Sequence, residues 1–139
     1  MTLARQIRNV GLAAIALMWA VAVATISAQA APKTVNDGVY SSGQASRGEA
    51  LFQSACTTCH APDRFTGKEF VSGWTGKPLS ELFKALQTMP EDNPGSLSAQ
   101  QYTDVMAYFL RLNEFPTGAE ELKGEPDVLA AIQVEALKP

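Results

Sequence analysis

Two cysteines and a histidine form the densest group of reactive side chains in the sequence. Cys56, Cys59 and His60 lie within the stretch SACTTCHAP, and His60 is the only histidine in the 139 residues. Three kinds of site use such residues: a zinc centre, a redox dithiol and an attachment point for haem. A structural zinc site needs about four nitrogen or sulfur ligands, and this cluster offers fewer. A redox dithiol needs a βαβ setting, which the sequence pattern does not supply.

The C-x-x-C-H spacing therefore favours haem attachment. Two thiols three residues apart can add to the two vinyl groups of one haem, and the histidine that follows then lies under the iron. Export usually makes two cysteines a disulfide, but a bridge across so short a loop removes little chain entropy and is a poor structural staple. The motif predicts one covalent haem c, attached through Cys56 and Cys59, with His60 as an iron ligand.

Met89 is the candidate for the sixth iron ligand. It lies 29 residues beyond His60 and directly before Pro90, so the chain has ample length to pass from one haem face to the other. The competing interpretation makes Met89 a gap-filling or surface residue. Met106 lies on a helical apolar stripe and is predicted to belong to the core. Ligation by histidine and methionine favours electron transfer at a raised potential.

Trp74 is the candidate for a polar contact with the cofactor. We predict that its indole N–H donates a hydrogen bond to a haem propionate while its ring forms a wall of the pocket. The alternative is a plain core position. Trp74 stands in residues 61–77, whose proline and glycines predict a loop.

Helices must position these residues, and the first carries the motif. The stretch QASRGEALFQSAC has apolar residues at helical spacing, and Ser46 and Glu49 have the spacing of a capping box. This helix is predicted to deliver Cys56 at its C-terminal end. A second helical pattern follows Pro78 and ends before Pro90, since the residue before a proline is pushed out of the helical region.

The clearest helix signal lies in SLSAQQYTDVMAYFLRLN. Ser98 and Gln101 form a capping box, and Tyr102 stands at the position of a hydrophobic staple. Phe52 and Tyr108 are predicted to support the fold where the first and last main helices cross at Gly48. Pro126 is predicted to begin a short helix in the tail. Strand alternation is absent from the sequence pattern, so the predicted class is all-α, with about three to four main helices.

The N-terminal residues 1–30 have the pattern of a secretory signal peptide. Arg5 and Arg8 precede an uncharged run from Val10 to Ile26, and residues 28–30 form an A-x-A cleavage site. The alternative is an uncleaved membrane anchor, although the run falls just short of the roughly 18 residues expected of a spanning helix. Cleavage changes the formal net charge from −3 to about −5, which argues against nucleic acid or an anionic membrane surface as a partner.

The chain resembles the class I c-type cytochromes. The resemblance rests on RGEALFQSACTTCH, on Trp74, on the TMP of residues 88–90 and on DVMAYFL, which follow the family order within residues 44–113. It implies a small all-α shell around one haem. The chain is also similar to haem domains associated with quinoprotein dehydrogenases. One departure concerns residues 65–76, which lack the proline whose carbonyl accepts the histidine N–H in many members, so the acceptor for His60 is not identified.

The resulting hypothesis is a periplasmic single-electron carrier that is not itself an enzyme. Its redox partners would be a dehydrogenase, including a quinoprotein, and an oxidase or reductase. A stable subunit of a dehydrogenase complex and an open-site haem protein, either gas sensor or peroxidase-like, are the alternatives. The last requires that Met89 not bind iron. The predicted organisation is a signal peptide (1–30), a lead-in segment (31–43), a haem domain (44–118) and a C-terminal extension packed on it (119–139).

Overall fold

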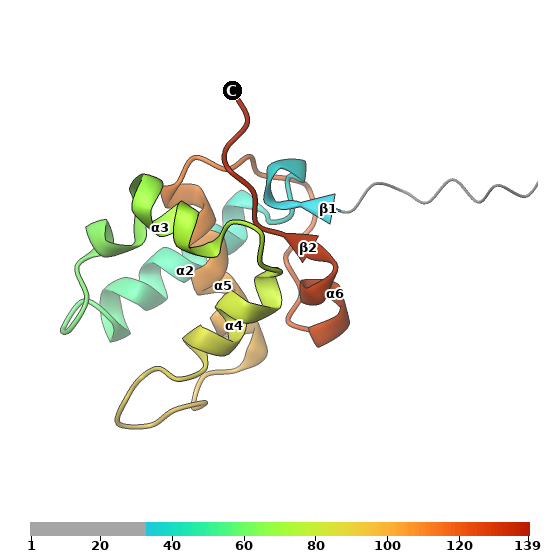
Figure 1. The fold of residues 1–139 in the computed structure, drawn as a ribbon. Helices are drawn as coiled ribbons and strands as arrows, with labels where there is room; N and C mark the ends of the chain where they lie inside the picture. The colour runs from blue at the N-terminus through green and yellow to red at the C-terminus, as the bar shows by residue number, and fades with distance from the viewer. Residues whose placement is uncertain (1–32) are drawn as a thin grey trace, which may run out of the picture. The chain divides into compact units, whose positions relative to one another are not determined.

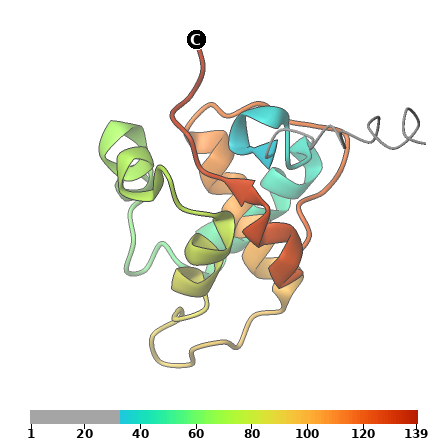
Figure 2. The same ribbon diagram turned by 45° about the vertical axis from the view of Figure 1, so that its right-hand side comes forward.

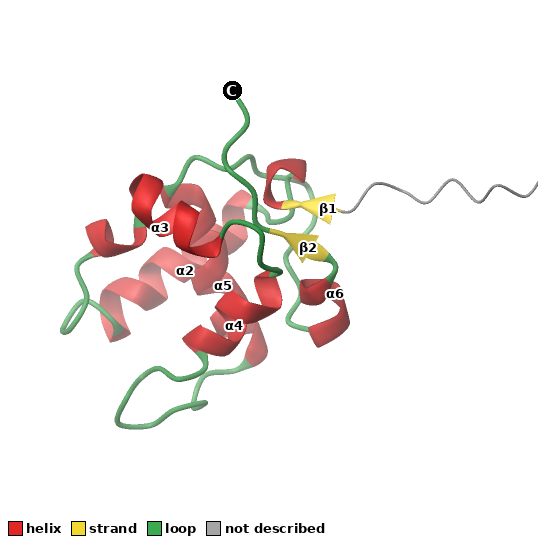
Figure 3. Ribbon diagram, viewed as in Figure 1, coloured by secondary structure: helices red, strands yellow, loops and turns green. Residues whose placement is uncertain are grey.

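The computed structural model describes residues 33–139, and the predicted signal peptide lies outside them. Within these residues, helices carry most of the regular structure (Figures 1 and 3). They are α2 (Ser42–Ala55), α3 (Gly67–Trp74), α4 (Leu79–Leu86), α5 (Ala99–Leu112) and α6 (Pro126–Ala130), with the short 3-10 helices η1 (Val35–Asp37) and η2 (Pro62–Phe65). The predicted all-α class is confirmed. None of the helices described here is long and apolar enough to cross a membrane.

Helices α2 and α5 cross at Gly48, as predicted. A Cβ atom at Gly48 would overlap the main-chain carbonyl of Asp104, so only glycine allows the two backbones to approach this closely. Beside the crossing, the rings of Phe52 and Tyr108 lie 5.5 Å apart between centroids, and both side chains are buried. Such aromatic contacts add to the apolar area that the crossing buries. The crossing places the C-terminal end of α2, and with it Cys56, at a fixed point on the surface of α5.

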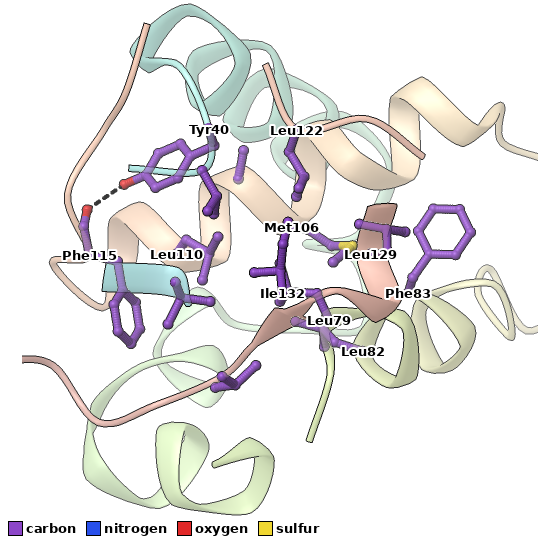
Figure 4. Packing of buried hydrophobic residues seen from close by; sticks show 14 of the residues in the cluster. Tyr40, Leu79, Leu82, Phe83, Met106, Leu110, Phe115, Leu122, Leu129 and Ile132 are labelled. Atoms are coloured by element: carbon purple, nitrogen blue, oxygen red, sulfur yellow. Dashed lines mark hydrogen bonds between the residues drawn. The ribbon is translucent and has the colours of Figure 1, made fainter. Parts of the chain in front are cut away.

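The main hydrophobic core gathers around Met106, which is fully buried as predicted (Figure 4). It takes side chains from α4, α5 and α6 and from the segment before α2. In that segment Tyr40 is completely buried, and its hydroxyl donates a hydrogen bond of 2.6 Å to the carbonyl of Phe115. The segment before α2 is therefore part of the packed interior.

The first helix begins earlier than the sequence predicts. Its N-cap is Ser41, whose side chain accepts a hydrogen bond from the main-chain N–H of Gln44, so the predicted capping box of Ser46 and Glu49 is wrong. Ser46 instead donates within the helix to the carbonyl of Ser42. Glu49 forms an ion pair of 2.7 Å with Arg111 of α5, a partner that the local sequence pattern cannot reveal.

Residues 61–77 are largely helical, which corrects the predicted loop. The segment folds into η2 and α3, and Phe70, Val71 and Trp74 pack on the core. These three side chains lie at the i, i+1 and i+4 positions of one helical face. The capping box of Ser98 and Gln101 at the start of α5 and the helix beginning at Pro126 are both confirmed.

Two buried polar contacts attach the C-terminal segment to the helices. Gln44 is fully buried, and its side-chain amide pairs in both directions with the main chain of Leu122, at 2.8 and 2.7 Å. The strand β2 (Ile132–Gln133) pairs in parallel with β1 (Lys33–Thr34), and Val134 exchanges main-chain hydrogen bonds with the connection between α3 and α4. This attachment fixes the start of α4, the helix that leads to Met89.

Candidate functional site

The Cys-Cys-His motif lies in a tight turn at the C-terminal end of α2. The main-chain N–H of Cys56 donates to Phe52 and caps the helix, while the N–H groups of Cys59 and His60 both donate to the carbonyl of Cys56, at 3.2 and 2.9 Å. The turn brings the three side chains to one place. Both thiols are free, with Cys56 half-buried and Cys59 exposed. Burial raises the pKa of the Cys56 thiol, which favours the protonated form over the thiolate needed for disulfide exchange.

A cavity of about 610 Å³ joins this motif to the loop that follows α4. The loop, residues 87–98, connects α4 to α5 and lies at the bottom of Figure 2. Cys56, Cys59, His60 and Met89 all line the cavity. Four of the five predicted site residues, taken from two segments distant in the sequence, therefore meet at one cavity.

The walls of the cavity suit a large apolar ligand. Leu86, Leu97 and Val105 supply apolar side chains from α4, from the loop and from α5. The volume lies within the range of about 300–1,000 Å³ that is usual for cofactor sites. Glu91 and Asp92 add acidic groups from the loop. Size, apolar lining and two thiols beside an imidazole fit a covalently attached haem.

His60 is held by an aromatic contact rather than by a hydrogen bond. Its ring nitrogen Nδ1 is buried and has no hydrogen-bond partner among residues 33–139. Its ring packs edge-on against Phe65 of η2, with 5.7 Å between centroids, and Phe65 in turn stacks on Phe109 of α5 at 4.3 Å. A ligating histidine usually donates its second N–H to an acceptor. Here Phe65 restricts the ring by packing, a role that the sequence reasoning did not assign.

Met89 lies three residues beyond the last residue of α4. Its main-chain N–H donates to the carbonyl of Leu86 at 2.9 Å, and its own carbonyl accepts a hydrogen bond of 2.8 Å from the hydroxyl of Tyr102. The residue is 37% exposed and lines the cavity. Tyr102, expected only as a hydrophobic staple, thus also anchors the main chain of Met89.

Trp74 is the one predicted site residue that the cavity lining does not include. It is the last residue of α3, packs against the main core, and is not part of the cavity lining within the described chain. The ammonium group of Lys77 lies over its ring, 5.1 Å from the centroid. This contact and the core packing account for its position. Its hydrogen bond to a propionate stays a prediction.

The zinc alternative lacks a suitable set of ligands in the described residues. Across residues 33–139, no group of three or more histidine, cysteine, aspartate or glutamate side chains is placed to hold a metal ion. A structural zinc site requires about four such ligands. The redox-dithiol alternative lacks its βαβ setting in the same residues. The strands β1 and β2 are two residues long, pair only with each other, and do not build a sheet next to the motif.

Comparison with known proteins agrees with this site. Residues 43–109 match the family described as cytochrome c oxidase, cbb3-type, subunit III. The matched segment contains all of α2 but its first residue, the Cys-Cys-His turn, Met89 and most of α5. No curated protein and no solved structure matches the chain significantly. Residues 43–109 are therefore similar to a cytochrome c family whose cofactor is covalently attached haem c. The small all-α fold and the C-x-x-C-H turn beside an apolar cavity fit that cofactor.

Proposed function

We propose that the protein is a single-electron carrier whose haem iron is ligated by His60 and Met89. The observation that carries the proposal is the cavity that both residues line together with Cys56 and Cys59. When bound, haem c supplies an iron centre that exchanges one electron between its ferric and ferrous states. Domains of this family are typically electron-transfer modules that act with redox partners, which supports a carrier rather than an enzyme.

Each lining residue has a distinct part in this proposal. The thiols of Cys56 and Cys59 would hold the cofactor by thioether bonds, and the imidazole of His60 would be one iron ligand. The thioether of Met89 would be the second iron ligand and would favour the ferrous state, which raises the potential. The apolar side chains of Leu86, Leu97 and Val105 restrict water, and a dry environment disfavours the more highly charged ferric state.

A redox titration followed by absorption tests the proposal. We expect one reversible one-electron step, with low-spin spectra in both oxidation states and a weak far-red band from sulfur–iron ligation in the oxidised protein. Carbon monoxide added to the reduced protein should bind slowly and incompletely. Complete binding on mixing, without the far-red band, would establish an open iron site and replace the carrier with the sensor or peroxidase-like alternative.

The location and partners of the carrier are part of the same proposal. The charge and apolar pattern of residues 1–30 support export to the periplasm, so we expect Ala31 to be the first residue of protein sequenced from that compartment. An intact leader in the membrane fraction would indicate an anchored form instead. The likeness to haem domains associated with quinoprotein dehydrogenases supports such an enzyme as electron donor, with an oxidase or reductase as acceptor. Reduction by a purified quinoprotein dehydrogenase is the check.

A further inference from the structure

The loop that carries Met89 depends on one long-range hydrogen bond. Ser98 at the end of this loop is the N-cap of α5. Within the described chain, the remaining loop residues 87–97 make their other hydrogen bonds inside the loop or to α4, such as those from Met89 to Leu86 and from Asn93 to Pro90. The bond from the Tyr102 hydroxyl to the carbonyl of Met89, 2.8 Å long, connects the loop to α5. It therefore ties the residue proposed as sixth ligand to the helix that crosses α2.

Tyr102 is itself rigidly placed. The residue is 2% exposed and lies in the first turns of α5, directly after the capping box formed by Ser98 and Gln101. Its ring packs edge-on against Phe83 of α4, with 5.9 Å between centroids, and Phe83 is also buried. A buried ring held between two helices has little freedom, so its hydroxyl is a fixed donor that can set the position of the loop.

We propose that Tyr102 is a positioning residue: by fixing the main chain of Met89, its hydroxyl holds the thioether at the iron and keeps external ligands out. This inference rests on the proposed ligation by Met89. The hydrogen bond stabilises the loop conformation seen here relative to any conformation in which the carbonyl of Met89 has moved away from Tyr102. The equilibrium between these two conformations shifts by the free energy that the bond contributes to the first and not to the second. An ordinary net hydrogen-bond strength corresponds to roughly a two- to tenfold shift in that equilibrium.

Tyr102→Phe in the haem-loaded protein tests the inference. The variant keeps the ring and its contact with Phe83 but loses the donor. We expect the reduced variant to bind carbon monoxide about two- to tenfold faster than the wild type, because the iron–sulfur bond opens more often. In denaturant, the far-red band of the oxidised variant should be lost before the helical circular-dichroism signal, whereas in the wild type we expect the two to be lost together.

Tyr40→Phe is the matched control. Tyr40 also donates a buried hydrogen bond to a main-chain carbonyl, that of Phe115, but it does not line the cavity. This variant should lose comparable stability while carbon monoxide binding and the far-red band stay as in the wild type. Equal behaviour of the two variants would reduce Tyr102 to a structural role and overturn the inference, while the proposed function would stand if the wild type has the band.

A measurement on the unaltered protein keeps the inference testable if Tyr102→Phe does not retain haem. In the reduced, low-spin protein, a thioether held in one orientation gives a single sharp methyl resonance for Met89. Two exchanging resonances for that methyl would mean that Tyr102 does not fix the loop, and the inference would fail. Absence of the far-red band in the wild type would overturn the proposed ligation by Met89, and this inference with it.

Discussion

Replacing both Cys56 and Cys59 with serine is expected to abolish covalent haem attachment. Serine keeps the shape of each side chain but lacks the sulfur that forms a thioether bond. After acid and solvent denaturation, the double variant should have the mass of the bare polypeptide, whereas the wild type keeps the added mass of one haem. Either single substitution should leave one thioether and lower the yield of haem-loaded protein.

Thr57→Ser is the control for the cysteine variants. Thr57 lies between the two cysteines, is exposed, and donates its hydroxyl to the carbonyl of Gln53, a bond that serine can also make. This variant should keep its haem through denaturation. If wild-type protein releases its haem under denaturing conditions, the covalent reading of the motif is wrong.

Met89→Ala is expected to change the iron site more than any other single substitution outside the motif. Alanine removes the thioether, so the far-red band should vanish and the reduced protein should bind carbon monoxide readily. The potential should fall on the order of 0.1 V, a fraction of the roughly 0.8 V range that axial ligands span. Absorption spectra, ligand binding and a redox titration of the purified variant measure these three changes.

Met106→Leu separates the loss of a ligand from the loss of a methionine. Met106 is fully buried in the main core and does not line the cavity. Leucine has a similar volume, so the variant should lose less than about 1.5 kcal/mol of stability and keep the band, the potential and the slow carbon monoxide binding. If instead Met89→Ala keeps the band, another group ligates the iron.

Patterns that are local in the sequence predicted much of the fold. The capping box at Ser98 determines where α5 begins, the apolar stripe places Met106 inside, and the glycine and aromatics predict the helix crossing at Gly48. The capping box and the apolar stripe are each complete within a few residues or on one helical face, whereas the crossing joins two helices and was expected from the resemblance to class I c-type cytochromes. The apolar stripe predicts correctly because burial of that face is the main source of helix stability in proteins.

Features that depend on distant partners could not be predicted. Ser46 and Glu49 have the spacing of a capping box, but Glu49 pairs with Arg111, and Ser41 caps the helix instead. In α3, helical spacing was hidden by two glycines, which lower intrinsic helix propensity. Packing of its apolar face against the core overrides that weak local preference. The two-residue strands β1 and β2 are too short for alternation to reveal them.

The candidate site divides in the same way. The C-x-x-C-H spacing identified three residues. The separation of 29 residues between His60 and Met89 indicated that the chain is long enough to bring Met89 to the other side of the cofactor. Both arguments need only distances along the chain. Phe65 contacts His60, and Tyr102 contacts Met89, across different structural elements. Neither contact produces a recognisable spacing of residues in the sequence. Sequence reasoning thus identified the groups proposed to bind the cofactor but not those that orient them.

The close contact between Gly48 and Asp104 also bears on the order in which the cavity is assembled. It closes residues 49–103 into a loop that contains the whole Cys-Cys-His motif and Met89. Loop-closure entropy rises slowly with length, by about 0.6 kcal/mol for each doubling, so one pairing of α2 with α5 restricts all four residues at once. An encounter of these two helices early in folding would leave only shorter, less costly rearrangements to bring Met89 into the cavity that His60 lines.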